Sequence, residues 1–293
     1  MGSSDIIENH RGAGDFFNAD GVRSFVRDEG KGEAVLCVHG VPASSFLYRK
    51  VLTELSVRGY RALCFDLPGL GLAERPEEYD YTWTGLGQFA RKAVRELELE
   101  RFHLVVHDIG GPVGFEVAAA MSDRIDSITL LNTIIRVDNF SRPWVMEPFA
   151  HWGIGEIWLK SMFKPVFRQL MYRIGLSDSS AVTSAEINAY VDLLKRNDRG
   201  AALLKIMRGF ERTEEKAHKY VNTVRNTDYP VGIVWGENDP ALSLSRYGVE
   251  AQEIVGREKI RTVPGKHFLQ EDNAPEIANY VDELARSASR TEP

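Results

Sequence analysis

Three side chains that can take part in covalent hydrolysis each follow a short apolar run of the sequence. They are Asp108 after residues 102–106, Asp239 after residues 231–235 and His267 after residues 260–263. An aspartate carboxylate forms an ester by attacking tetrahedral carbon, and a histidine can deprotonate the water that cleaves such an ester. Their types and their order in the chain therefore predict hydrolysis through a covalent ester.

Each of these residues has one predicted role. The Asp108 carboxylate is ionised at neutral pH without a base, so it attacks carbon directly and expels a leaving group. His267 then activates the water that attacks the Asp108 ester, and Asp239 holds the imidazole in the required tautomer and stabilises its cation. The backbone N–H groups of Ile109 and Val41 are predicted to bind the oxyanion that forms.

The residues around Asp108 predict how it is presented. An apolar strand, the turn Gly110-Gly111 and a helical pattern follow one another, which is the layout that lifts a nucleophile above a parallel sheet. The pattern Gly-x-Ser-x-Gly does not occur in the chain. A carboxylate in this position disfavours amide or ester cleavage and favours a carbon that bears a halide or an epoxide oxygen.

Short apolar runs alternate with helical patterns along the chain, which is typical of a mostly parallel sheet with helices on both faces. The runs are Ala34 to Val38, Arg61 to Phe65, Phe102 to Val106, Ser127 to Leu131, Val231 to Trp235 and Ile260 to Val263. The three candidate residues thus lie just past the carboxyl ends of strands, where ligands bind in open α/β sheets.

This alternation stops between residues 136 and 228. Prolines and aromatic residues punctuate the segment, and Thr183-Ser184-Ala185-Glu186 predicts a capping box in front of a helix. We expect an α/β core formed by residues 1–135 and 229–293, with a helical cap inserted at residues 136–228. A length of 293 residues suits one core with such an insert.

The composition disfavours several classes of partner. The formal net charge is -6 and no Lys/Arg block forms a basic footprint, so neither nucleic acid nor a membrane is expected as a partner. Metal-ligand spacing and a Gly-x-x-x-x-Gly-Lys loop are both missing, so we expect no metal and no cofactor. A small apolar molecule and water are the predicted partners of a monomer or homodimer.

Cys37 and Cys64 lie in apolar runs and are predicted to be buried and reduced. The N-terminal residues show no basic and apolar signal pattern, and no apolar stretch reaches 18 residues, so the expected location is the cytoplasm. Residues 1–4 are expected to be a frayed end, and the polar tail after Leu284 is expected to be mobile.

Four segments together resemble haloalkane dehalogenases and, close behind them, epoxide hydrolases of the α/β-hydrolase superfamily. They run from His39 to Lys50, from Asp66 to Pro76, from Val105 to Gly111 and from His267 to Glu271. The likeness covers nearly all of the core and is weak in the cap. It implies the α/β-hydrolase fold, with Asp108 as nucleophile, His267 as base and Asp239 as supporting acid.

The chain departs from the dehalogenase pattern at two positions. These enzymes carry Trp directly after the nucleophile, and many carry Asn after the His-Gly pair, whereas this chain has Ile109 and Val41. The resemblance implies instead that a cap tryptophan donates its indole N–H to the halide, Trp158 first and Trp144 second. The alternative interpretation of both residues is packing within the cap.

Epoxide opening makes a different demand, because the leaving alkoxide stays attached and needs a proton or a hydrogen bond, usually from cap tyrosines. Tyr172 and Tyr190 are the candidates, although Tyr190 also falls on the apolar stripe of its predicted helix. The sequence leaves the choice between the two activities open. A third hypothesis is a ligand receptor without catalysis, against which the complete set of three residues argues.

Three further polar residues near these positions are predicted to support the structure. His107 adjoins Asp108 but should point away from it, because side chains alternate along a strand. His39 is expected to brace its loop through hydrogen bonds. Asn132 follows the run 127–131 and cannot ionise, so it could at most assist the acid.

Overall fold

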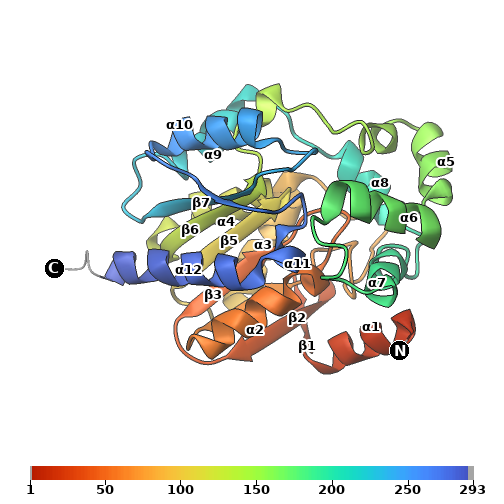
Figure 1. The fold of residues 1–293 in the computed structure, drawn as a ribbon, viewed down its shortest axis with the longest axis horizontal. Helices are drawn as coiled ribbons and strands as arrows, with labels where there is room; N and C mark the ends of the chain where they lie inside the picture. Colours follow the sequence, from red (N-terminus) through yellow and green to blue (C-terminus); the bar gives the residue numbers. More distant parts are fainter. Residues whose placement is uncertain (1, 290–293) are drawn as a thin grey trace.

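The computed structural model describes residues 2–289, and its centre is a sheet of eight strands (Figure 1). The strands lie in the order β1-β2-β4-β3-β5-β6-β7-β8. Their bounds are β1 Asp15–Ala19, β2 Val22–Gly30, β3 Ala34–Val38, β4 Arg61–Phe65, β5 Phe102–Asp108, β6 Ile125–Thr133, β7 Val231–Gly236 and β8 Arg261–Val263. Strands β3 to β8 are parallel, and β2 is antiparallel to β1 and β4.

The six strands predicted from apolar runs are β3 to β8, and the prediction of a mostly parallel sheet is confirmed. The continuous apolar character of β3 to β7 follows from burial on both faces, whereas two of the three residues of the edge strand β8 are exposed. In β5, Leu104 and Val106 belong to the core on one face of the sheet, whereas Val105 belongs to the core on the other face. The hairpin of β1 and β2 was not predicted.

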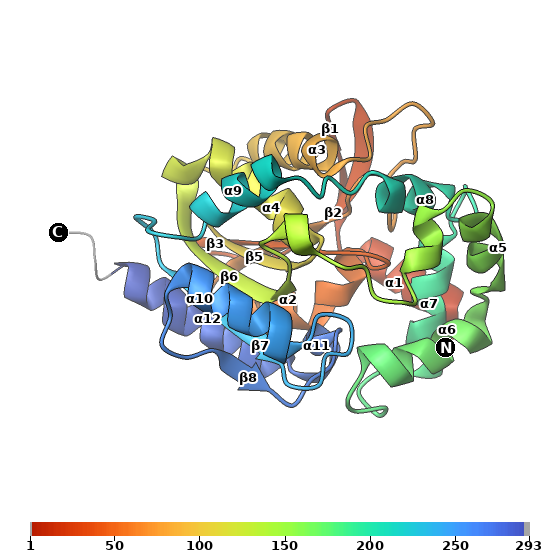
Figure 2. The same ribbon diagram turned by 90° about the horizontal axis from the view of Figure 1, so that it is seen from above.

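Helices cover both faces of the sheet (Figure 2). Their bounds are α1 Ser3–Gly12, α2 Arg49–Val57, α3 Trp83–Glu96, α4 Gly110–Ala120, α5 Ile154–Ser161, α6 Lys164–Leu170, α7 Ser184–Leu194, α8 Ala201–Arg208, α9 Glu214–Asn222, α10 Val249–Val255, α11 Leu269–Asp272 and α12 Ala274–Ser289. Helices α2 and α12 pack on one face, and α3 and α4 pack on the other.

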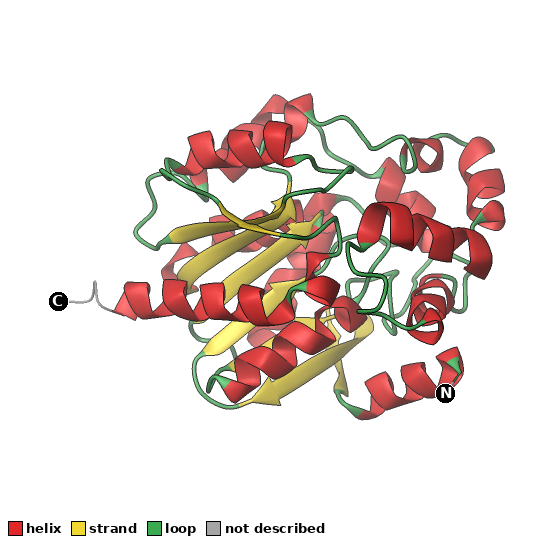
Figure 3. Cartoon of the chain, viewed as in Figure 1, coloured by secondary structure: helices red, strands yellow, loops and turns green. Residues whose placement is uncertain are grey.

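Between β6 and β7 the described residues form helices and loops (Figure 3). The predicted capping box is present, because the Thr183 hydroxyl accepts a hydrogen bond from the Glu186 N–H and the Glu186 carboxylate accepts one from the Thr183 N–H. Helices α5 to α8 gather at one end of the molecule (Figure 1). The last helix of the segment, α9, packs instead against α4 of the core, where the Tyr220 and Phe115 rings lie 5.6 Å apart.

The predictions for both ends of the chain need correction. Residues 3–12 form α1, whose His10 is buried and lies 3.1 Å from the Ser45 hydroxyl, so residues 3 and 4 begin a packed helix and are not a frayed end. The tail after Leu284 continues α12 to Ser289, and residues 290–293 lie outside the described part. Among residues 2–289, no helix is both long enough and apolar enough to span a bilayer.

Candidate active site

Asp108 is the last residue of β5 and adopts a left-handed backbone conformation, with φ at 53°. Its carbonyl accepts a hydrogen bond from the Thr133 hydroxyl at 2.6 Å, and α4 begins two residues later. A Cβ at Gly110 would lie 2.3 Å from the Val38 carbonyl oxygen, so the turn needs glycine there. The chain thus forms a sharp strand-to-helix turn that presents the Asp108 side chain above the sheet.

The structure brings Asp108, His267 and Asp239 together. The Nδ1–H of His267 donates to Oδ2 of Asp239 at 2.9 Å, and its Nε2 lies 3.7 Å from Oδ2 of Asp108. The second distance is too long for a hydrogen bond, so Nε2 faces the Asp108 carboxylate without being bonded to it. The imidazole is therefore fixed on its Nδ1 side and available on its Nε2 side.

Hydrogen bonds hold the Asp239 carboxylate at both oxygens. Oδ1 accepts from the backbone N–H groups of Ala241 at 2.7 Å and Leu242 at 3.0 Å. Oδ2 accepts from the Asn132 amide at 2.8 Å as well as from His267. Asn132 therefore assists the acid, as its position suggested. The four bonds fix the orientation of the carboxylate and hence the histidine tautomer.

Two backbone N–H groups act on the Asp108 carboxylate. Val41 N–H donates to Oδ1 at 2.9 Å, and Ile109 N–H also hydrogen-bonds to the side chain. A Cβ at Gly40 would lie 2.3 Å from Oδ1, so only glycine lets the loop after β3 approach this closely. The N–H groups that were predicted to form an oxyanion hole thus already contact an oxygen of Asp108.

The three charged groups shift one another's protonation. Burial raises the pKa of Asp108, although His267 and the two N–H groups oppose this shift. Burial also disfavours the His267 cation, but the charges of Asp239 and Asp108 outweigh it and leave the pKa of His267 above the usual 6.5. The two carboxylates therefore stabilise the His267 cation, and His267 favours the charged form of Asp108.

A cavity lies over this site, and its lining side chains are almost all apolar. Its polar side chains are Asp108, His267 and Arg142. The apolar lining includes Phe140, Val145, Met146, Phe149, Met162, Phe167, Leu170, Met171, Leu194, Leu203, Met207, Phe210, Leu242 and Phe268. Most of these residues belong to the cap, so the cap encloses the reactive groups in a water-poor space.

None of the four cap residues predicted to bind a leaving group lines this cavity. The Trp158 indole N–H donates to the Val145 carbonyl at 3.0 Å, and Trp144 is 71% exposed. Tyr190 is buried away from the cavity, where its hydroxyl donates to Glu271 at 2.5 Å. Tyr172 contributes a backbone carbonyl that accepts from Lys266, and its ring packs on the neighbouring apolar cluster.

The predictions for the two core histidines are confirmed. His107 is buried and its Nε2–H donates to the His267 carbonyl at 2.9 Å. His39 braces its loop, because Nδ1–H donates to the Gly40 carbonyl and Nε2 accepts from the Leu67 N–H. Burial lowers the pKa of both imidazoles, so both are neutral structural groups.

Arg142 is the cavity residue that sequence reasoning missed. It lies in Ser141-Arg142-Pro143, between β6 and α5, where no strand or helix periodicity orients its side chain. The only local signal is a cation within an aromatic stretch. Within residues 2–289, no group of three or more His, Cys, Asp or Glu side chains could hold a metal ion.

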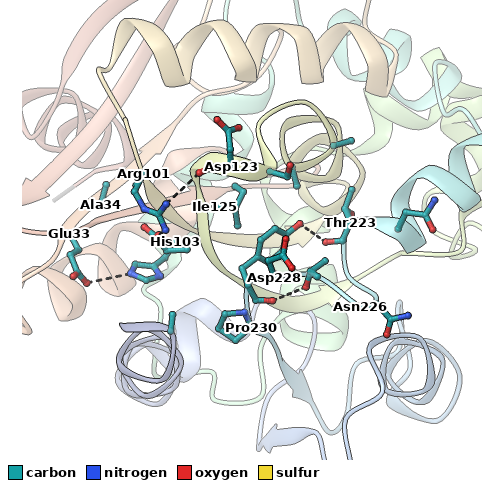
Figure 4. A pocket seen from close by; sticks show the side chains of 18 of the residues that line it. Glu33, Ala34, Arg101, His103, Asp123, Ile125, Thr223, Asn226, Asp228 and Pro230 are labelled. Carbon is teal, nitrogen blue, oxygen red and sulfur yellow. Dashed lines mark hydrogen bonds and ion pairs between the residues drawn. The ribbon is translucent and has the colours of Figure 1, made fainter. Parts of the chain in front are cut away.

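A wider polar groove lies at the opposite end of the sheet, by the first residues of β3 and β6 (Figure 4). Some of its charged groups pair with one another or with the backbone. Glu33 lies 3.5 Å from His103, and Arg101 donates to the Asp123 carbonyl. The three candidate residues do not line this groove.

The sequence model of the alpha/beta hydrolase fold family matches residues 33–274, so the chain belongs to this family. It is a hydrolase of the α/β-hydrolase superfamily. The predicted α/β-hydrolase fold is thereby confirmed, and solved structures superpose on nearly the whole chain. Cfl2 from Burkholderia cenocepacia does so with a TM-score of 0.79 and 20% identity, covering 93% of this chain and 95% of that chain.

An epoxide hydrolase from Vigna radiata, VrEH1, superposes with a TM-score of 0.74 and 19% identity, covering 94% of this chain and 97% of that chain. Among sequences, a hydrolase of Saccharomyces cerevisiae, YNR064C, is 25% identical over 279 residues, which are 89% of this chain and 93% of the relative. Haloalkane dehalogenase 2 of Mycobacterium tuberculosis is 35% identical over 118 residues, which are 40% of this chain and 41% of the relative.

Proposed function

We propose that this protein hydrolyses the carbon–halogen bond of a small, largely apolar substrate through an alkyl ester on Asp108. The observation that carries the proposal is the position of the Asp108 carboxylate. It lines an apolar cavity, receives the Val41 N–H at 2.9 Å and faces Nε2 of His267 at 3.7 Å. The similarity to haloalkane dehalogenases supports the same reaction class.

In the first step, Oδ2 of Asp108 attacks the carbon, a new C–O bond forms, and the halide leaves with the electron pair of the broken bond. Oδ2 suits this role because Oδ1 accepts the Val41 N–H. An apolar, water-poor cavity removes the hydration shell that would weaken the carboxylate as a nucleophile. The product of this step is a neutral ester of Asp108 and a halide ion.

In the second step, His267 Nε2 takes a proton from water, and the resulting hydroxide attacks Cγ of Asp108. The negative charge moves to Oδ1, where the Val41 N–H and the Ile109 N–H stabilise it. The tetrahedral intermediate then expels the alkoxide, which receives the proton from His267 and leaves as an alcohol. Asp239 stabilises the imidazolium during this exchange. Asp108 is left as a carboxylic acid and releases its proton to regenerate the carboxylate, so overall substrate and water give alcohol, halide and one proton.

The second candidate function is epoxide hydrolysis by the same two steps. It is favoured by Ile109 and Val41, which occupy the positions where the dehalogenase pattern carries Trp and Asn. An epoxide oxygen stays bonded to the substrate after ring opening, so its hydrolysis needs no halide-binding indole or amide.

One experiment separates these functions. Purified protein is incubated with 1-bromohexane and with 1,2-epoxyhexane, and bromide and diol are quantified separately. Bromide release that is lost in Asp108→Asn supports dehalogenation, and diol formation without bromide release supports the second candidate. Binding of either compound without any product would favour the receptor hypothesis and refute both catalytic proposals.

A further inference from the structure

Arg142 is the one cationic side chain that the cap contributes to the cavity wall among the described residues. The rest of the cap lining is apolar. A guanidinium in such surroundings is costly, since its N–H groups lose water without gaining protein partners. Its presence therefore calls for a specific reason.

The partners of Arg142 satisfy only part of its donor capacity. Nη2 donates to the Met207 carbonyl at 2.9 Å, and Nη1 lies 3.8 Å from the half-exposed Glu147 carboxylate. The guanidinium also lies over the Phe210 ring, 5.0 Å from its centre. The side chain is 7% exposed, yet its Nε is buried without a hydrogen-bond partner. Nη1 is beyond hydrogen-bond distance of Glu147, so the guanidinium of this cavity-lining residue keeps donor capacity that a ligand can use.

The surroundings favour an anionic ligand. Burial and then the charge of Arg212 oppose the Arg142 cation, and Glu147 compensates only in part because its distance exceeds that of a hydrogen bond. The planar edge of a guanidinium matches a carboxylate or a phosphate in a bidentate manner, and the apolar cavity favours the singly charged carboxylate. A bound carboxylate would accept from the unused donors of Arg142 and neutralise the buried charge.

Building on the proposed function, we propose that Arg142 binds a carboxylate at the end of the substrate remote from the bond that breaks. Within residues 2–289 no ion pair joins Arg142 to Asp108. The charges that act on Arg142 are those of Arg212 and Glu147. The charges that act on Asp108 are those of His267 and Asp239. The preferred substrate is then a short apolar chain with a reactive carbon at one end and a carboxylate at the other.

Ligand binding tests this inference without any turnover. Calorimetry with hexanoate and with 1-hexanol compares two ligands that differ in the carboxylate. Wild-type protein is expected to bind hexanoate at least roughly tenfold more tightly, as a charge-assisted hydrogen bond implies, and Arg142→Met is expected to lose this preference. Arg212→Met is the matched control, because Arg212 lies nearby but does not line the cavity, and it should keep the preference.

A second variant tests the same inference if Arg142→Met does not fold. Glu147→Gln leaves Arg142 in place and removes the competing carboxylate, so hexanoate should bind more tightly than to the wild-type protein. A hexanoate preference that persists in Arg142→Met, or that never exists in the wild-type protein, overturns the inference.

Turnover measurements distinguish two roles of Arg142, namely binding the substrate carboxylate and binding the leaving group. The ratio of kcat/KM for 6-bromohexanoate to that for 1-bromohexane should fall roughly tenfold or more in Arg142→Met and recover in part in Arg142→Lys. An equal loss of kcat on both substrates would mean that Arg142 acts on the halide or only braces the cap, which contradicts the anchor role. Hexanoate preference without turnover of any bromide or epoxide would refute the proposed function and leave the binding site intact.

Discussion

The core and the cap contribute to the site in different ways. The core supplies Asp108, Asp239 and His267, each at the end of a parallel strand and each fixed by backbone or side-chain hydrogen bonds. The cap supplies mainly apolar walls, together with one arginine. It also carries most of the large apolar side chains that are exposed, namely Trp144, Trp152, Ile154, Ile157 and Phe163. We infer that the core determines which reaction takes place and the cap determines which molecule reacts.

Removal of the nucleophile should give the largest effect. Asp108→Ala is expected to reduce turnover by roughly four orders of magnitude or more, because no ester can form. Trp158→Phe is the matched change in the cap and should cost only a few-fold, since Trp158 does not line the cavity and its N–H is already bonded to the Val145 carbonyl. Steady-state rates, with circular dichroism to verify folding, measure both. A large loss of turnover in Trp158→Phe, with little loss in Asp108→Ala, would mean that the cap and not the core determines the reaction.

Removal of the base should stop the reaction after its first step. His267→Gln is expected to accumulate the ester, so intact-mass spectrometry should detect an adduct of the alkyl group on the protein. An epoxide would leave a hydroxyalkyl group instead, which distinguishes the two candidate functions. The double variant with Asp108→Ala is the control and should remain unmodified. Full turnover with an unmodified mass would refute the role of His267.

Changing the supporting acid should have a smaller but still large effect. Asp239→Asn removes the negative charge that stabilises the His267 cation, and a loss of roughly a hundred- to ten-thousandfold in the hydrolysis step is expected. Pre-steady-state measurement should find the first step much less affected, because it needs no base. Equal loss in both steps would mean that Asp239 holds the fold of the site and does not act through the histidine.

The pH dependence tests how the charges are coupled. Only neutral His267 accepts a proton, so ester hydrolysis should slow as the pH falls through its pKa. In the ester, Asp108 is neutral and no longer helps to raise this pKa, while Asp239 still does. The midpoint for ester hydrolysis in single-turnover experiments should therefore lie below the pKa of His267 measured by NMR in the free protein. A higher midpoint would contradict this coupling.

The smallest effects are expected at cap residues outside the cavity. Tyr190 joins α7 of the cap to Glu271 of the core, which also contacts Arg49 at 2.5 Å. Tyr190→Phe should lower the free energy of unfolding by about 1–2 kcal/mol, because it leaves the buried carboxylate with one donor fewer. Turnover should change little. Thermal unfolding and steady-state rates test this, and a selective loss of epoxide turnover would restore the tyrosine as a leaving-group donor.

The sequence predicted the core well because burial leaves a strong local pattern. Strands β3 to β7 are covered on both faces and therefore read as continuous apolar runs. The candidate residues follow β5, β7 and the edge strand β8. The hairpin strands β1 and β2 escaped prediction, because polar residues such as Asp15, Asn18 and Arg23 interrupt their apolar character.

Side chains of the cap are harder to place from the sequence, for a different reason. Residue type suggested Trp158 as a halide donor, but its N–H finds a partner 13 residues away, in Val145. Conversely, nothing local distinguished Arg142, whose position depends on how the loop before α5 packs against Met207 and Phe210. The position of a side chain on an irregular loop depends on tertiary contacts, and these leave no periodic pattern in the sequence.

The packing of α1 against α7 has a consequence for biosynthesis. The N-terminal helix leaves the ribosome roughly 170 residues before the cap helix that covers it, which at about 5–20 residues per second is a delay on the order of 10–30 s. Through this interval the cap part of the apolar cluster on which Ile6 and Ile7 pack has not been made. Helix α1 therefore completes its packing long after its own synthesis.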